Sequence, residues 1–489
     1  MSSNPPLPGY QAASISSLLD SDSDDDALKA LGYAPSFTRE FSNLATISFA
    51  FSIMGVCSSV ASTFNTPLLL GGPASVTWCW LLGGSNCVLL EGSIAEIVSA
   101  YPTCGGLYTA SAKLCPRKYR ARVGWVVGWL NILGQFVGLS STEFGLANMI
   151  LAAVVVARDD FVITPGKAVR LTTALLFVHG ILNSLRTRHL ALLTSSFLFV
   201  NMHPASYVFG SDGLVDGTGG WGRGMSFLLG LLTYAAPATI AIATLGTLII
   251  GWLLNITLIL VSGPLYLLPG PSGSAFLAIL SMRLGRGPAL ALWSLVCLTA
   301  FCVCQSGLQA GLRTIYAFSR DGGLPDGGYF ARVNARSKTP IRAVWLTVLV
   351  SVLPGLLDLA SPIAAMAIFA MISMSMDLSY IVPIILRRLF HAHPEVQFVP
   401  GPFALGNGVM GWVANWGCVV WTLFVCVIFS LPTVMPVTGR NMNYASVVMV
   451  GVVVGSGVWY VLGAHQHYKG PAEEVEVVGV EDEEKVVVL

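Results

Sequence analysis

The sequence predicts an all-α polytopic membrane protein, and its composition and charge spacing carry that prediction. The chain has 489 residues, of which 54% are hydrophobic and only 10% are charged. Soluble proteins carry about 25% charged residues. Charged residues are absent from 224–282 and from 396–439. Each of these windows holds at least one apolar run of about 20 residues, the length that crosses a bilayer.

Ten apolar runs are long enough to be predicted as membrane spans. They are 42–66, 75–99, 123–156, 169–185, 238–262, 288–318, 343–360, 362–386, 412–435 and 443–463. Two further stretches are weaker. Residues 190–209 are interrupted by Asn201, His203 and Pro204, and residues 226–236 are only about half a span long.

Basic residues set the orientation of these spans, because cytosolic loops of membrane proteins are enriched in Lys and Arg. The basic stretches are 113–122, 185–189, 319–342 and 387–393. All four stretches can lie in the cytosol only if the two weak stretches both cross the membrane, which gives twelve spans, or if neither crosses, which gives ten. The expected organisation is an acidic cytosolic tail over 1–40, a transmembrane domain over 41–464 and a second acidic cytosolic tail over 465–489.

Several functional classes find no support in the sequence. The formal net charge is +1, which gives no reason to expect nucleic-acid binding. The ten cysteines lie in or at the ends of apolar runs and form no Cys-x-x-Cys pair, so neither a metal site nor a disulfide framework is predicted. The seven histidines are scattered and none pairs with a nucleophile. We therefore expect no enzyme activity and no cofactor.

A polar waist interrupts the first span at "SIMGVCSSVAST", residues 52–63. Gly55, Ser58 and Ser59 stand where lipid-facing Leu or Ile would be more favourable. Small residues and hydroxyls favour close helix packing in membranes. They also suit a helix that unwinds beside a water-filled cavity. Composition and spacing leave both interpretations open.

Long motifs resemble the fungal amino acid/choline permeases, the GABA-permease and choline-transporter branch of the amino acid–polyamine–organocation superfamily. The resemblance covers Leu31 to Pro471. Its principal blocks are "LGYAPSFTREFSNLATISFAFSIMGVCSSVASTFNTPLLLGGPASVTWCW" (31–80), "AEIVSAYPTCGGLY" (95–108), "GWLNILGQFVGLSSTEFGLANMI" (128–150), "AFSRDGGLP" (317–325) and "PVTGRNMNYASVV" (436–448).

The resemblance implies a transporter fold of two inverted five-helix repeats with two added helices. In such folds the first helix of each repeat is broken at the midplane, where the freed half-helix N-terminus and bare amides bind an anionic substrate group. The resemblance therefore favours the interpretation that the polar waist of the first span unwinds beside a cavity. The substrate-binding residues expected there are Gly55, Val56, Cys57, Ser58 and Ser59.

Three further polar residues are candidates for the substrate site. Glu143 interrupts the third span and is either a proton carrier or a counter-ion for a substrate ammonium group, unless the long run leaves it at the outer interface. Gln135 and Gln305 would hydrogen-bond the substrate or merely a neighbouring helix.

A cytosolic gate is expected from Glu96, Tyr316 and Arg320. Glu96 lies close to the cytosolic end of the second span and is predicted to pair with a basic residue such as Arg39 or Arg320.

The sequence departs from the family pattern in the fifth and sixth helices, which are shortened. Residues 227–246 run from the start of the sixth helix almost directly into the turn before the seventh, so the substrate-facing half is missing. We expect a short helix over 226–236, irregular structure over 190–224 and a full span after Pro237. Either the gene model omits coding segments that were taken for introns, or the protein has truly lost half of its substrate site. Two shortenings so close together favour the first.

The expected function is secondary active transport of a small amino acid, amine or quaternary-ammonium solute (GABA, choline or a related compound) by alternating access, coupled to protons. The alternative is a non-transporting sensor or inactive paralogue with a defective site. The expected location is the plasma membrane, with the vacuole or another internal membrane as the alternative. The expected partners are the lipid bilayer, the substrate, a co-transported proton and the ubiquitin-ligase machinery acting on the tails.

Overall fold

The computed structural model describes residues 52–103, 105–186, 239–359, 362–396, 398–401, 403–431 and 442–471. Residues Thr38–Gly470 form one compact unit, and the terminal segments Met1–Phe37 and Pro471–Leu489 form another, of which only Pro471 is described. The expected helix over 226–236 and the irregular segment 190–224 lie outside the described residues.

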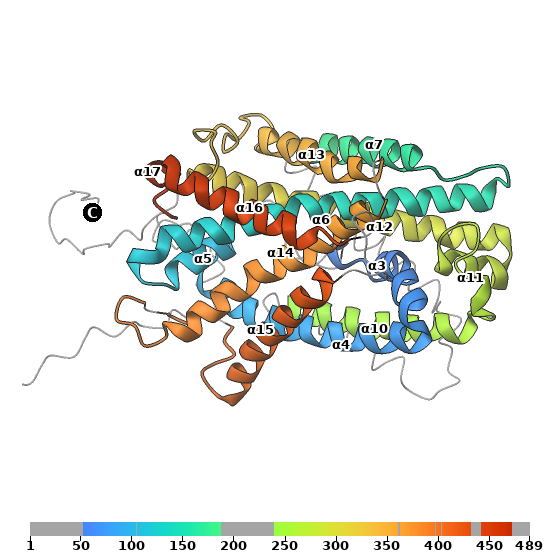
Figure 1. The fold of residues 1–489 in the computed structure, drawn as a ribbon, viewed down its shortest axis with the longest axis horizontal. Coiled ribbons are helices and arrows are strands. Elements are labelled where there is room, and N and C mark those ends of the chain that lie inside the picture. The colour runs from blue at the N-terminus through green and yellow to red at the C-terminus, as the bar shows by residue number, and fades with distance from the viewer. Residues whose placement is uncertain are drawn as a thin grey trace, which may run out of the picture. The chain divides into compact units, whose positions relative to one another are not determined.

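The described part of the main unit consists of helices and connecting loops, without strands (Figure 1). Its α-helices are α3 (Val56–Thr63), α4 (Asn65–Ala100), α5 (Leu107–Lys113), α6 (Arg120–Ala157), α7 (Pro165–Asn183), α10 (Thr239–Val261), α11 (Ala275–Leu284), α12 (Arg286–Arg320), α13 (Ile341–Leu356), α14 (Pro362–Leu389), α15 (Val409–Ser430), α16 (Ala445–Trp459) and α17 (His465–His467). Short helical turns are η2 (Arg117–Tyr119), η3 (Leu265–Leu267), η4 (Leu357–Leu359) and the π-helical η5 (Tyr460–Ala464).

Seven helical stretches within the described chain are long and apolar enough to cross a membrane. They are Asn65–Ala100, Arg117–Ala157, Thr244–Val261, Arg286–Arg320, Ile341–Leu359, Val409–Ser430 and Ala445–His467. Each contains or closely overlaps one predicted span. Helices also occupy the predicted spans 169–185 and 362–386, as α7 and α14. A long helix begins at Thr239, as expected after Pro237.

The entry into the second span differs from the prediction. Helix α4 begins at Asn65, directly after Phe64, and bends at Gly72, which has φ 69° and ψ −167°. A left-handed φ of this kind suits glycine, and Pro73 then lacks the N–H that would continue the hydrogen-bond ladder. The span is therefore a bent helix that begins at Asn65, ten residues before the predicted start at residue 75.

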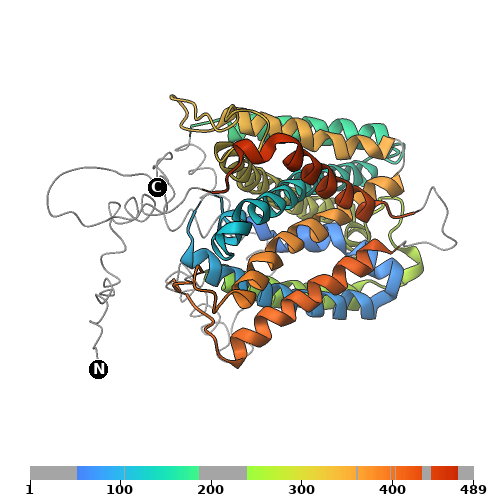
Figure 2. The same cartoon turned by 60° about the vertical axis from the view of Figure 1, so that its left-hand side comes forward.

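Helices α6 and α12 lie side by side at the centre of the unit. Helix α12 also packs on α3, α7, α11 and α13, and α6 packs on α5, α7, α13, α14 and α16. At the periphery α13 runs beside α7 and α15 runs beside α4 (Figure 1, Figure 2). Because α3 is held between α10 and α12, the polar waist of the first span faces other helices.

Candidate functional site

The first span is broken at Gly55. Residues 52–54 are helical, Gly55 adopts a left-handed conformation with φ 42° and ψ 63°, and α3 begins at Val56. The sequence predicts non-helical or strained backbone over 54–59. The structure confirms the break at Gly55 and shows helix on both sides of it. The helix resumes at once because the Ser59 amide donates to the Gly55 carbonyl at 2.8 Å.

Two serine hydroxyls satisfy the backbone at the break. Ser58 Oγ donates to the Gly55 carbonyl at 2.8 Å, and Ser59 Oγ donates to the Met54 carbonyl at 2.7 Å. The first amides of a helix have no intrahelical acceptor and carry partial positive charge. At the start of α3 these amides belong to Val56, Cys57 and Ser58, and the first two of these residues are half-buried. The arrangement can accept an anionic group.

Helix α12 closes against the break. Ser52 Oγ donates to the Cys302 carbonyl at 3.2 Å and accepts from Ser306 Oγ at 3.0 Å. The Val303 side chain lies where a β-carbon on Gly55 would be. Glycine is therefore required at position 55 by its conformation and by this close approach.

Other polar groups reach the same region from α4 and α10. The Thr244 hydroxyl of α10 donates to the Glu91 carboxylate of α4. The Thr247 hydroxyl lies 3.3 Å from Met54 Sδ. Glu91 is thus bonded to Thr244, which lies one turn of α10 from Thr247. Thr247 in turn touches Met54, the residue before Gly55.

Glu143 is buried inside the helix packing. Its Oε1 is 2.6 Å from His179 Nδ1, and both side chains are 0% exposed. The His179 ring lies against the ring of Phe301, with centroids 4.1 Å apart. The Glu143 carboxylate thus shares a proton or an ion pair with a histidine of α7, beside α12.

Sequence reasoning missed His179, although a usable signal was present. It is the only ionisable side chain between Arg170 and the end of α7. An ionisable residue within a span is a functional candidate by default. What the sequence did not show was its partner, which lies on a different helix.

The two glutamine candidates both belong to the α6–α12 region, in different settings. Gln305 is 0% exposed, and neither its Oε1 nor its Nε2 has a hydrogen-bond partner among the described residues. Gln135 is half-buried and faces the backbone of Gly311, with Oε1 3.2 Å from the ideal β-carbon position there. Burying an unpartnered amide costs about 1–3 kcal/mol, which marks Gln305 as a group that a ligand or water would satisfy.

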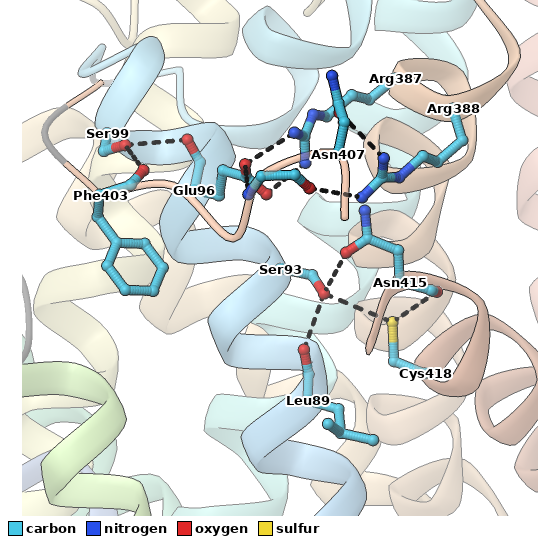
Figure 3. A network of polar contacts seen from close by, with 11 residues as sticks. Leu89, Ser93, Glu96, Ser99, Arg387, Arg388, Phe403, Asn407, Asn415 and Cys418 are labelled. Carbon is cyan, nitrogen blue, oxygen red and sulfur yellow. Dashed lines mark hydrogen bonds and ion pairs between the residues drawn. The ribbon is translucent and has the colours of Figure 1, made fainter. Parts of the chain in front are cut away.

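The predicted gate residue Glu96 pairs with Arg387 (Figure 3). Arg387 holds the carboxylate through both terminal nitrogens, and the second of these contacts is 2.7 Å. Glu96 Oε1 also accepts from the Gly406 amide at 3.3 Å. Of the two predicted partners of Glu96, Arg320 is among the described residues, and its prediction as the partner is wrong. The end of α4 packs instead on α14 and on the loop before α15. The other predicted partner, Arg39, lies outside the described residues.

Arg388 extends this network to α15. The amide oxygen of Asn415 faces α14 and accepts from Arg388 Nε at 2.8 Å and from one terminal nitrogen of Arg388 at 2.9 Å. The amide nitrogen of Asn415 donates to Ser93 Oγ at 2.8 Å. Arg388 also donates to the Asn407 side chain at 3.2 Å. Charged and polar groups of α4, α14 and α15 therefore form one connected cluster (Figure 3).

Of the other two predicted gate residues, Arg320 belongs to a second network. Tyr316 is buried in α12. Arg320 Nε lies 2.9 Å from Asp321 Oδ1, and Tyr108 Oη donates to Asp321 Oδ2 at 2.8 Å. The gate expected as one group of three residues is thus divided between the end of α4 and the end of α12.

Comparison with known proteins decides the family. A family model described as amino acid permease matches residues 42–209 and 234–454. The chain belongs to the amino acid permease family. The permease is 35% identical to amino-acid permease 2 of Neurospora crassa, over 95% of this chain and 92% of that one. It is 28% identical to the GABA-specific permease of Saccharomyces cerevisiae, over 92% of this chain and 86% of that one.

Solved structures support the predicted all-α transporter fold. The crystal structure of the Eremococcus coleocola manganese transporter, in complex with an aromatic bis-isothiourea substituted compound, superimposes on the permease with a TM-score of 0.50. The match covers 87% of this chain and 95% of that chain at 12% identity. A likeness at this identity concerns the fold alone. The inverted relation of the two repeats stays a prediction.

The permease lacks residues that its relatives have. The alignment with the Neurospora crassa protein spans 510 positions, more than the 489 residues of this chain. The family match is interrupted over 210–233. The interruption falls where the sequence predicts shortened fifth and sixth helices.

Proposed function

We propose that the permease moves a small amino acid, amine or quaternary-ammonium solute across the plasma membrane by alternating access, coupled to protons. The observation that carries the proposal is the break at Gly55, which frees the amides at the start of α3 between α10 and α12. A helix N-terminus of this kind attracts a carboxylate. The Glu91 carboxylate, bonded to Thr244 on the helix that touches Met54, supplies the negative charge that suits a cationic amine near the break.

This chemistry favours an amino acid over choline. An amino acid such as 4-aminobutyrate offers a carboxylate to the α3 amides and an ammonium group to a glutamate. Choline has no carboxylate and would leave those amides without a partner, at a cost of about 1–3 kcal/mol for each buried unsatisfied group. The 28% identity with a GABA-specific permease is in line with this preference.

Uptake measurements test the proposal directly. The full chain is expressed in a transport-deficient yeast, and its presence at the cell surface is checked by labelling. We expect cells to accumulate radiolabelled 4-aminobutyrate or another amino acid well above vector controls, and choline more weakly. If no solute from a panel of amino acids, 4-aminobutyrate and choline accumulates while the protein is at the surface, transport is contradicted.

A non-transporting sensor or inactive paralogue is the second candidate, because the family match is interrupted over 210–233. In a fold of this kind each broken helix contributes half of one midplane site. Sequencing the transcript across codons 190–245 distinguishes a removed coding segment from a real loss. If a longer transcript exists, its product is expected to transport and the 489-residue form to bind substrate weakly or not at all.

We propose that the tails take part in regulated endocytosis through ubiquitin ligation. Lys29 follows an acidic run, and Lys469 and Lys485 flank the acidic C-terminal segment. Replacing all three lysines with arginine keeps the charge and removes the acceptor amines. We expect slower loss of the protein from the surface after substrate addition, measured by fluorescence microscopy. Unchanged turnover would contradict the proposal, and Lys167→Arg, on α7, is the matched control.

A further inference from the structure

The Glu143–His179 pair is the most deeply buried contact between acidic and basic side chains near the broken helix. Both side chains are 0% exposed, and Oε1 and Nδ1 are 2.6 Å apart. The second atom of each group, Glu143 Oε2 and His179 Nε2, is also buried and has no hydrogen-bond partner among the described residues. A purely structural pair would be expected to satisfy these atoms as well.

Burial determines how many protons the pair holds. Without a titratable proton, the Glu143–His179 pair carries a net charge of −1. With one proton on the carboxylate and one on the imidazole, it carries +1. A net charge in an apolar interior is costly, whereas one shared proton makes the pair neutral as either an ion pair or a neutral hydrogen bond. The occluded pair therefore favours one proton, and its gain or loss requires access of water to the free Oε2 or Nε2 atom.

One stretch of α12 connects the pair to the broken helix. Phe301 lies against His179, and α12 also packs on α6, which carries Glu143. Residues of the same turns hold the break: Cys302 and Ser306 hold Ser52, and Val303 abuts Gly55. Residues 301–306 thus contact the protonated pair on one side and the substrate-binding break on the other.

Other titratable groups lie on the helices around this pair. Asp377 lies on α14, which packs on α6, and Glu91 on α4 accepts from Thr244. Arg170 on α7 and Arg313 on α12 are each about 2.5 helical turns from His179 and Cys304, respectively. Glu143 is the only charged residue of α6 after Arg122. On η4, which packs on α7, Asp358 is buried at the end of the α13 span.

We propose that Glu143 and His179 form the binding site of the coupling proton, and that residues 301–306 of α12 link its occupancy to the break at Gly55. The inference rests on the proposed proton-coupled transport. A proton enters from water on one side of the membrane, is held between Oε1 and Nδ1 while the site is closed, and leaves to water on the other side. No bond other than those to this proton forms or breaks.

The test uses the full chain in proteoliposomes, with radiolabelled 4-aminobutyrate as the probe and a pH-sensitive dye inside. The wild type is expected to accumulate the probe when the outside is acidic and to acidify the lumen as it does so. Glu143→Gln removes the proton-binding carboxylate with little change of shape. We expect at least about a tenfold loss of gradient-driven accumulation, a flat dependence of uptake on external pH, and loss of probe-evoked acidification.

Three further variants sharpen the test. His179→Gln is expected to give the same three losses, and Glu143→Asp is expected to retain a pH-dependent uptake with a shifted profile. Asp159→Asn removes an exposed carboxylate, 3.7 Å from Arg286, and should leave the pH profile as it is in the wild type. Size-exclusion chromatography and thermal melting establish that each variant is folded, and His179→Gln carries the test if Glu143→Gln does not fold.

The outcomes separate the two proposals. A wild type that takes up neither 4-aminobutyrate nor any other solute of the panel contradicts the proposed function, and the proton site falls with it. A wild type whose uptake ignores the pH gradient contradicts proton coupling alone. If the wild type is proton-driven and both Glu143→Gln and His179→Gln still acidify the lumen with the probe, the proton site lies elsewhere. Loss of probe binding in a folded Glu143→Gln protein would instead make Glu143 a substrate contact and overturn the inference.

Discussion

Gly55→Ala is expected to reduce uptake by at least about thirtyfold while leaving surface expression near normal. Two effects act together on the broken helix. A left-handed backbone costs a residue with a β-carbon roughly 1–2 kcal/mol, and Gly55 has φ 42°. The new methyl group also overlaps Val303, and overpacking of this kind costs about 1–3 kcal/mol. The measurement is initial uptake of labelled substrate per surface copy.

Two companion variants test the cause of that loss. Val303→Ala combined with Gly55→Ala relieves the overlap but not the backbone strain, so we expect partial recovery of uptake. Gly307→Ala is the matched control, since this glycine lies within α12 with nothing near its β-carbon position. It should leave uptake unchanged. Wild-type uptake by Gly55→Ala would remove the break from the transport mechanism.

Glu96→Gln is expected to destabilise the permease by about 3–5 kcal/mol, because removal of one member of a buried ion pair leaves the other charge without compensation. Glu96 is 0% exposed and Arg387 is 5% exposed, so water cannot replace the lost carboxylate. Arg388 beside it adds a second positive charge to the same cluster. The measurement is the free energy of unfolding, or the melting temperature, of the purified protein in detergent.

The exposed pair of Asp159 and Arg286 provides the matched comparison. Its atoms are 3.7 Å apart and its side chains are 92% and 50% exposed. Exposed pairs contribute about 0–1 kcal/mol, so Asp159→Asn should change stability little. The double variant of Glu96→Gln with Arg387→Gln removes both charges, and we expect it to be more stable than Glu96→Gln alone. Equal effects of Glu96→Gln and Asp159→Asn would show that the buried pair has no special role in stability.

Local properties of the chain were sufficient to predict the class of the protein and most helix positions. The run 123–156 corresponds to α6, Arg120–Ala157, because a predominantly apolar run of about 20 residues or more determines a span wherever it packs. Gly55 identified the break for a similar reason. Only glycine takes a left-handed φ without steric cost, and the hydroxyls that satisfy the adjacent carbonyls follow within four residues.

The bend at Gly72 was not predicted, because a Gly-Gly-Pro sequence suits a turn as well as a kinked helix. The division of the gate into two networks also escaped prediction. Glu96, Tyr316 and Arg320 are all predicted near cytosolic ends of spans, but that shared prediction says nothing about which ends pack together.

Sequence by itself determined that this protein is a helical membrane permease, roughly where most of its spans lie, and that its first span is broken at Gly55. Tertiary structure alone decided that Glu143 meets His179 and that Glu96 meets Arg387, partners 36 and 291 positions away along the chain. The physical reason is that hydrophobic length and glycine conformation act within one helix. Charge pairing depends instead on which helices pack together and on the face that each turns toward its neighbour.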